Sequence, residues 1–196
     1  MIIRNIWAIG RNYAEHAKEL GNEIPSEPLI FLKAGSCAVM NSSEFSLPTW
    51  TTDIHHEVEL ALVFDDQLQI QKAAVALDIT ERTLQGKLKA KGSPWTLAKS
   101  FPQSCPISDF FPVKNLDELK SLDISLTVNG ELRQKGNTSQ MIFSLEQQIE
   151  YVRAHFPVCP GDVLLTGTPS GVGPVKRGDQ LVAEISGKIR KNWKVT

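Results

Sequence analysis

Apolar and polar residues alternate along several short stretches of the chain, which is the pattern of half-buried β-strands. These stretches read PLIFLK, HHEVELALVF, KAAVALDI, DISLTVNG, ELRQKG, DVLLTG, QLVAEIS and KIRKNWKV. In TVNGELRQ, Asn129 and Gly130 stand between two such segments, and Asn-Gly is a strong signal for a two-residue hairpin turn. ISGKIR is a similar but weaker case. The pattern predicts a protein built mainly of strands.

Helical patterns are fewer. RNYAEHAKELGN predicts a helix that Asn12 caps, with Glu15 three residues later as in a capping box and Gly21 as the stop. Residues 144–156 predict a second helix capped by Ser144, whose apolar stripe is Leu145, Ile149 and Val152. TERTLQGKLKAKG predicts a third, short helix. Together these elements predict a β-rich α+β fold in which residues 1–196 form a single domain.

Composition narrows the class of protein. A chain of 196 residues can bury a sizeable core, and a net charge of -1 without a long basic block argues against nucleic-acid or membrane partners. MIIRNIWAIG lacks the features of a signal peptide, and no segment approaches the ~18 apolar residues of a membrane span. Cys37, Cys105 and Cys159 lack paired spacing, so we expect three reduced thiols in the cytoplasm, or in the mitochondrial matrix of a eukaryote.

The segment DIHHEVEL places two carboxylates in a strand that otherwise has a buried pattern. Glu57 and Glu59 would point to the same face, roughly 7 Å apart, and would repel each other unless a cation, a shared proton or water compensates. Asp78 follows the apolar run AAVAL, where a strand would end. Three carboxylates without a cysteine suit Mg²⁺ or Mn²⁺. The alternative is that the glutamates lie on the solvated face of an edge strand.

His55 shares the predicted face of the glutamates. It could complete a site of two carboxylates and one histidine for Zn²⁺ or Fe²⁺. The favoured interpretation is that His55 packs or forms a hydrogen bond near the start of the strand.

Three further stretches could carry chemistry. His16 and Glu19 lie three residues apart on the first predicted helix, so the carboxylate could orient the imidazole as a base; a solvated pair is the alternative.

Lys99 interrupts the apolar stretch WTLAKSF. It could stabilise a negative charge that develops on a substrate, and the alternative is a surface lysine whose ammonium group reaches solvent. In TGTPSGVGP, backbone amides and the Thr168 hydroxyl could hold a carboxylate, although a plain turn is equally consistent.

In order along the chain, GRNYAEH-x-x-E, FLK, HHEVEL, LDIT-x-R-x-x-Q, PWTLAKSF, VNGELRQ and TGTPSGVGP resemble the fumarylacetoacetate hydrolase superfamily. The resemblance is greatest to its small acylpyruvate hydrolase and oxaloacetate-acting branch, and to related isomerase/decarboxylases. It implies a mixed β-roll or β-sandwich with few short helices, which is usually dimeric, and a bound Mg²⁺ or Mn²⁺.

The resemblance also implies roles for single residues. The metal ligands would be Glu57, Glu59 and Asp78. The water-activating pair on a mobile helix would be His16 and Glu19, and Lys99 would face the substrate. Thr168 would bind a carboxylate, and the remaining pocket candidates are Arg11, Arg82 and Gln85. The chain departs from the family pattern in a shorter segment between Glu59 and Asp78, and in Thr83, where aspartate usually follows the arginine.

The expected activity is hydrolysis of the C–C bond of a 3-acylpyruvate through a pyruvate enolate. Alternatives on the same site are an oxaloacetate tautomerase or decarboxylase, or a 2-hydroxyhepta-2,4-diene-1,7-dioate isomerase. A further alternative is a non-catalytic binder of small keto acids. The expected partners are a small dicarbonyl carboxylic acid and a second copy of the chain in a homodimer.

Overall fold

The largest sheet has six strands and supports the candidate site. In the computed structural model, which describes residues 2–19, 21 and 25–196, β1 pairs with β13 in parallel and the other neighbours are antiparallel. In spatial order the strands are β10 (Phe111–Pro112), β7 (Ile70–Leu77), β6 (Val58–Phe64), β13 (Val163–Leu165), β1 (Asn5–Gly10) and β2 (Leu29–Ala34).

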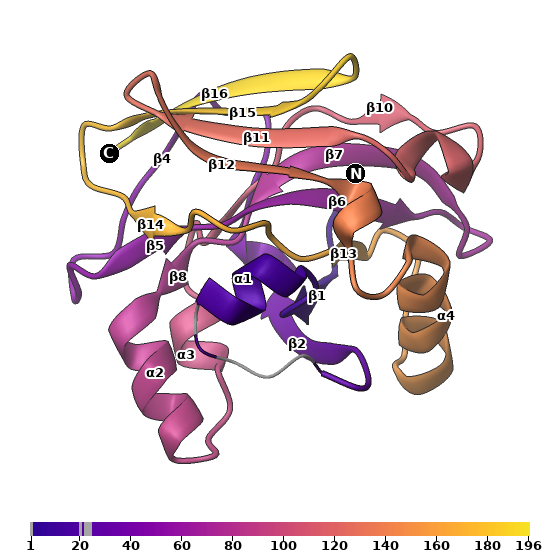
Figure 1. Ribbon diagram of the computed structural model, residues 1–196, viewed down its shortest axis with the longest axis horizontal. Helices are drawn as coiled ribbons and strands as arrows, with labels where there is room; N and C mark the ends of the chain where they lie inside the picture. Colours follow the sequence, from indigo (N-terminus) through magenta and orange to yellow (C-terminus); the bar gives the residue numbers. More distant parts are fainter. Residues whose placement is uncertain (1, 20, 22–24) are drawn as a thin grey trace.

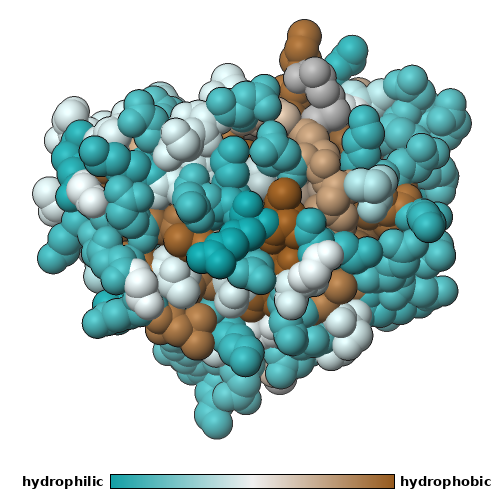
Figure 2. All heavy atoms as spheres, turned by 90° about the horizontal axis from the view of Figure 1, so that it is seen from above, coloured by the Kyte–Doolittle hydropathy of each residue, from teal (hydrophilic) through white to brown (hydrophobic). Residues whose placement is uncertain are grey.

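A five-stranded sheet packs over this one (Figure 1). Its strands, in spatial order, are β12 (Glu131–Asn137), β11 (Asp123–Val128), β15 (Gln180–Ile185), β16 (Ile189–Val195) and β4 (Glu44–Phe45). Asn129 and Gly130 connect β11 to β12 with φ angles of 53° and 84°, as a hairpin turn with two left-handed residues requires. The Asn-Gly hairpin prediction is therefore confirmed. Seen from above these strands, the surface is mostly hydrophilic (Figure 2).

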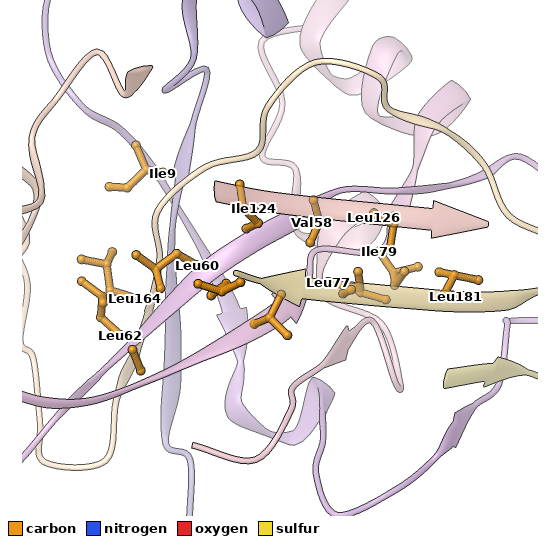
Figure 3. Close-up of a cluster of buried hydrophobic side chains, with 14 of the residues drawn as sticks. Ile9, Val58, Leu60, Leu62, Leu77, Ile79, Ile124, Leu126, Leu164 and Leu181 are labelled. Atoms are coloured by element: carbon orange, nitrogen blue, oxygen red, sulfur yellow. The ribbon is translucent and has the colours of Figure 1, made fainter. Parts of the chain in front are cut away.

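The main hydrophobic core lies between the two sheets. Val58 and Leu77 of the larger sheet belong to the same buried cluster as Ile124, Leu126 and Leu181 of the smaller one (Figure 3). Every residue of β6 is buried, because the alternate residues Ala61 and Val63 belong to a second cluster on the other face. Strand β6, which contains Glu59, is therefore covered on both faces, and Glu57 immediately before it is also buried, which excludes the interpretation of the two glutamates as residues of a solvated edge.

Shorter elements complete the fold. The helices are α1 (Ala14–Glu19), α2 (Arg82–Ala90), α3 (Thr96–Lys99) and α4 (Leu145–His155), with 3₁₀ turns at Gly35–Cys37, Leu116–Leu119 and Thr138–Gln140. A three-stranded sheet contains β14 (Gly173–Pro174), β5 (Ile54–His56) and β8 (Thr80–Glu81), and β3 (Ala38–Val39) pairs with β9 (Cys105–Pro106). Helices α1, α2 and α3 lie on the side of the molecule away from the five-stranded sheet (Figure 1).

The predominantly β, α+β class predicted from the sequence is confirmed. Ser144 caps α4, accepting a hydrogen bond from the backbone N–H of Gln147 at 3.2 Å, as expected. The cap predicted for α1 is wrong, because the side chain of Asn12 instead donates to the carbonyl of Thr166 at 2.8 Å. Gly21 has the left-handed φ of a helix stop, whereas Leu20 and Asn22 of the predicted segment lie outside the described residues.

The structure also bears on the predictions about the cysteines and about membrane-spanning segments. Cys37, Cys105 and Cys159 are free thiols, as predicted. Among the residues that the structure describes, no helix combines the length and apolar character needed to cross a membrane.

Candidate active site

Three buried carboxylates meet where β6 begins and β7 ends. The register pairs Val58 with Leu77, so Asp78 lies opposite Glu57, and its N–H donates to the Glu57 carbonyl at 2.8 Å. The sequence predicted one continuous strand here, but Glu57 interrupts it and separates β5 from β6. The side chains of Glu57, Glu59 and Asp78 each offer an oxygen within 4.8 Å of the other two. The short connection between β6 and β7 is a simple hairpin, and it leaves Asp78 beside the glutamates.

Two buried lysines neutralise part of this charge. Lys99 donates through Nζ to Glu57 at 2.7 Å, to Asp78, and to the Thr80 hydroxyl at 2.7 Å. It is therefore fully buried in ion pairs and is not the snorkelling surface lysine that was one alternative. Lys33 donates to Asp78 at 2.7 Å, and to the carbonyls of Ser104 and Lys99.

Sequence reasoning missed Lys33 as part of the site. Its side chain has 0% exposure, so these hydrogen-bond partners replace the water that a buried ammonium group would otherwise lack. The available signal was the FLK stretch of β2, where a lysine stands in an alternating apolar segment.

The glutamates differ in their electrostatics. Burial would raise the pKa of Glu57, but the charges of Lys99 and Arg82 outweigh it and hold that pKa far below its usual range. Burial and the neighbouring charges of Asp78 and Glu57 raise the pKa of Glu59 well above its usual range, although Gly167 donates to it at 2.7 Å. In the absence of a cation, the cluster therefore favours a proton on Glu59 over a third negative charge. Buried oxygen donors without sulfur fit a hard divalent cation such as Mg²⁺ or Mn²⁺.

Helix α2 places Arg82 and Gln85 against the carboxylates. Its N-terminus is capped by the side chain of Glu81, and Arg82 donates to Glu57 and, at 2.7 Å, to Gln85. Thr83 stands where the family pattern described above has aspartate. Its hydroxyl donates a hydrogen bond to Asp53 at 2.6 Å, so this position still makes a polar contact.

His55 does not join the carboxylate cluster. Its Nε2 lies 3.2 Å from Asp53, as the hydrogen-bonding interpretation expected.

His16 faces the cluster from α1. Its Nδ1 lies 3.2 Å from the carboxylate of Glu19, which in turn accepts from the backbone N–H of Gly171 at 3.0 Å. Gly171 has φ +92°, and a Cβ there would lie 2.0 Å from the Arg133 carbonyl oxygen, so this amide is available to Glu19 only with glycine at the position. Burial lowers the pKa of His16, so the ring is neutral near pH 7. With its Nδ1 proton directed at Glu19, Nε2 is the basic atom.

Gln134, which sequence reasoning also missed, orients Thr168. Its amide donates to the Thr168 hydroxyl at 2.7 Å and its oxygen accepts from the Val58 N–H at 3.0 Å. His56 Nδ1 lies 3.0 Å from the same oxygen. Since the hydroxyl of Thr168 accepts one hydrogen bond from Gln134, its own hydrogen is left to donate to another group. Gln134 stands in the VNGELRQ motif, which was the available signal.

Nearly all the predicted site residues line one cleft. They are Arg11, His16, Glu57, Glu59, Asp78, Arg82, Gln85, Lys99 and Thr168. Glu19 stands behind His16. The other lining residues, which the sequence did not single out as site residues, are Ile9, Gly10, Phe31, Lys89 and Trp95. The cleft therefore joins a carboxylate cluster, a neutral histidine base and several cationic side chains.

Known proteins share this sequence and fold. The family described as fumarylacetoacetate (FAA) hydrolase C-terminal matches residues 5–194. The chain is 44% identical over 202 residues to the mitochondrial oxaloacetate tautomerase of Bos taurus, covering 98% of this chain and 91% of the relative. It is 44% identical over 195 residues to the mitochondrial oxaloacetate decarboxylase of Dictyostelium discoideum, covering 94% and 89%.

Solved structures agree. A fumarylpyruvate hydrolase from Pseudomonas aeruginosa, in complex with Mn²⁺ and pyruvate, superposes with a TM-score of 0.92 at 32% identity, covering 99% of this chain and 90% of that one. A 2-hydroxyhepta-2,4-diene-1,7-dioate isomerase from Mycobacterium marinum superposes with a TM-score of 0.84 at 30% identity, covering 100% and 75%. The chain belongs to the fumarylacetoacetate hydrolase family, whose resemblance was evident in its motifs.

Proposed function

We propose that the protein is a divalent-metal-dependent oxaloacetate tautomerase, which interconverts the enol and keto forms of this 2-oxo acid. The observation that carries the proposal is the juxtaposition, in one cleft, of the three buried carboxylates and the neutral His16. The names of the relatives from Bos taurus and Dictyostelium discoideum favour oxaloacetate over the acylpyruvate expected from the sequence.

Glu57, Glu59 and Asp78 would hold Mg²⁺ or Mn²⁺. The ion would supply a Lewis acid that draws electron density from the carboxylate and 2-oxo oxygens of the substrate. Thr168 has a hydroxyl hydrogen left to donate to the substrate carboxylate, because Gln134 already donates to its oxygen. These groups would fix which carbon faces α1.

His16 would move the proton. Its Nε2 is the basic nitrogen, and the lowered pKa keeps it unprotonated near neutral pH. It would remove a proton from C3 of the keto form, while a proton is added to the oxygen on C2, and the reverse would convert enol to keto. Glu19 would stabilise the ring while it carries the additional proton.

Hydrolysis of a 3-acylpyruvate is the second candidate. The specific observation in its favour is the same His16–Glu19 pair, which is equally suited to take a proton from water. The P. aeruginosa fumarylpyruvate hydrolase shares the fold. Decarboxylation of oxaloacetate needs no attacking water and is therefore a further possible outcome on this site.

The test is a comparison of substrates by ultraviolet absorbance. The decay of enol-oxaloacetate is followed with Mn²⁺, with Mg²⁺ and with excess EDTA, alongside acetylpyruvate cleavage and release of CO₂. We expect enol decay that requires the cation and falls about 100-fold or more in His16→Ala, the lower range for loss of a general base. Glu15→Gln, an exposed change on the same helix, is the matched control. Cleavage of acetylpyruvate without enol decay would instead establish the hydrolase.

A further inference from the structure

Lys89 lies in the cleft without a carboxylate partner. It projects from α2 and is partly buried, with Nζ 4.9 Å from the centre of the Trp95 ring. Within the described part of the chain, no carboxylate lies within 4 Å of its ammonium group. Burial lowers its pKa to about 8, and the charges of Arg11, Arg82 and Lys99 act in the same direction. A bound anion would stabilise the positive charge of a lysine in this position.

Arg11 is the second unbalanced cation. Its Nε is buried and has no hydrogen-bond partner among the described residues. Its backbone has a φ of 59°, an uncommon conformation for a residue other than glycine, and Arg11 lines the cleft. Arg82 and Lys99, by contrast, are paired with Glu57 and, for Lys99, also with Asp78.

Two aromatic rings connect the unbalanced cations with the carboxylate end of the cleft. Lys99 Nζ lies 5.0 Å from the centre of the Phe31 ring, and the Phe31 and Trp95 ring centres are 5.7 Å apart. Lys89 stands over Trp95, at the other end of this pair. Arg11, Lys89 and Trp95 also line the groove that continues outward from the cleft. The wall is thus apolar between a carboxylate cluster at one end and cations at the other.

We propose that Lys89 and Arg11 bind the second carboxylate of a 2-oxo dicarboxylic acid, whose first carboxylate and oxo group lie at the Thr168 and carboxylate-cluster end. The inference deepens the function proposed above and rests on it, because it assumes that a 2-oxo acid occupies that end. It makes Lys89 and Arg11 determinants of specificity for dicarboxylates over monocarboxylates. A charged pair of donors aimed at a carboxylate gives the short, strong hydrogen bonds that such discrimination needs.

The test measures binding, so that it does not depend on turnover. Calorimetry on the Mn²⁺-loaded protein compares 2-oxoglutarate with 2-oxopentanoate, which differ in a carboxylate that replaces a methyl group. We expect the dicarboxylate to bind about 100-fold more tightly, because two charged contacts each contribute about tenfold. Lys89→Gln and Arg11→Gln each reduce this ratio about tenfold, while the affinity for 2-oxopentanoate stays the same. Lys87→Gln, an exposed change on the same helix, leaves the ratio unchanged.

The outcomes separate this inference from the function on which it rests. Equal binding of the two acids by the wild-type protein, binding of neither, or an unchanged ratio in both variants overturns the subsite. A ratio that depends on Lys89, together with no turnover of oxaloacetate, supports the subsite and contradicts the tautomerase.

Discussion

The two halves of the candidate site are built in different ways. The carboxylate cluster lies at the junction of β6 and β7, is almost fully buried, and receives contacts from Lys33, Lys99 and Arg82. Helix α1 has six residues, and the side chain of its Glu19 is 33% exposed. Among the residues that the structure describes, Glu19 has one hydrogen-bond partner besides His16, the backbone amide of Gly171.

The difference separates two tasks. Helices as short as α1 have little stability of their own, so the position of His16 depends on its few contacts. The carboxylates are fixed by the sheet register and by several ion pairs at once. We infer that the cluster determines folding and cation binding, and that α1 determines proton transfer. Substitutions on the two sides should therefore affect different measurements.

The largest effect is expected at Lys33. Lys33→Met removes the ammonium group that donates to Asp78 and to two backbone carbonyls, and leaves these acceptors buried. Breaking one partner of a buried ion pair costs about 3–5 kcal/mol, so we expect the free energy of unfolding in urea to fall by that amount.

Lys72→Met is the matched control. Lys72 is an exposed lysine of β7, so this change should alter the free energy of unfolding by less than about 0.5 kcal/mol. Equal stability of the two variants would show that Lys33 is not a structural part of the cluster.

The next effect is expected on turnover alone. His16→Ala removes the base, so kcat for enol-oxaloacetate should fall by about 10²–10⁴, the usual contribution of a general base. Mn²⁺ affinity and the unfolding midpoint should change little, because His16 does not lie in the carboxylate cluster. Lost Mn²⁺ affinity in this variant would contradict the division between the two halves.

The pH dependence of kcat sharpens the assignment. Burial lowers the pKa of His16 below its ordinary 6.5, and the neutral ring is the active form. Activity should therefore persist below pH 6.5 and be lost as the pH falls through the lowered pKa. If activity already declines at a pH above 6.5 as the pH is lowered, His16 is not the base.

The two halves of the site differ in how far the sequence alone could predict them, because one depends on local spacing and the other on strand register. His16 and Glu19 are neighbours on a helix, so their contact follows from local spacing alone. The strand period correctly placed Glu57 and Glu59 on one face. That Asp78 joins them depends on the register of the β6–β7 hairpin, which the family resemblance implied and local spacing did not.

Contacts between distant segments were not predictable. Lys33 reaches Asp78 across 45 positions, and Gln134 reaches Thr168 across 34. Asn12 was assigned to a local cap because a capping residue is recognised by its neighbours, whereas its actual partner Thr166 is 154 positions away. The homodimer and the single-domain organisation stay predictions.

A smaller effect concerns the stability of the cation-free protein. Because burial and the charges of Asp78 and Glu57 raise the pKa of Glu59 above 4.5, the folded state retains a proton that the unfolded state has lost. Stability should therefore decrease as the pH rises from about 4.5 through the raised pKa of Glu59. Thermal unfolding in EDTA, followed as the pH is raised, measures this loss.

Glu59→Gln should remove that part of the pH dependence, together with the stabilisation by added Mn²⁺. Glu44→Gln, an exposed change in β4, should keep both. Unchanged pH dependence in Glu59→Gln would mean that the proton is held elsewhere in the cluster.

The smallest effect is expected at Glu19, whose role is to orient and stabilise the charged form of His16. Glu19→Gln keeps an oxygen that can accept from Gly171 but removes the negative charge, so we expect kcat to fall about tenfold, equivalent to about 1.4 kcal/mol. The unfolding midpoint should match that of Glu15→Gln, the exposed control on α1. Since Glu19 acts through His16, adding Glu19→Gln to His16→Ala should cause no further loss of turnover. An additive loss in the double variant would show that Glu19 contributes through Gly171 and the loop around it, and the two halves of the site would then be coupled.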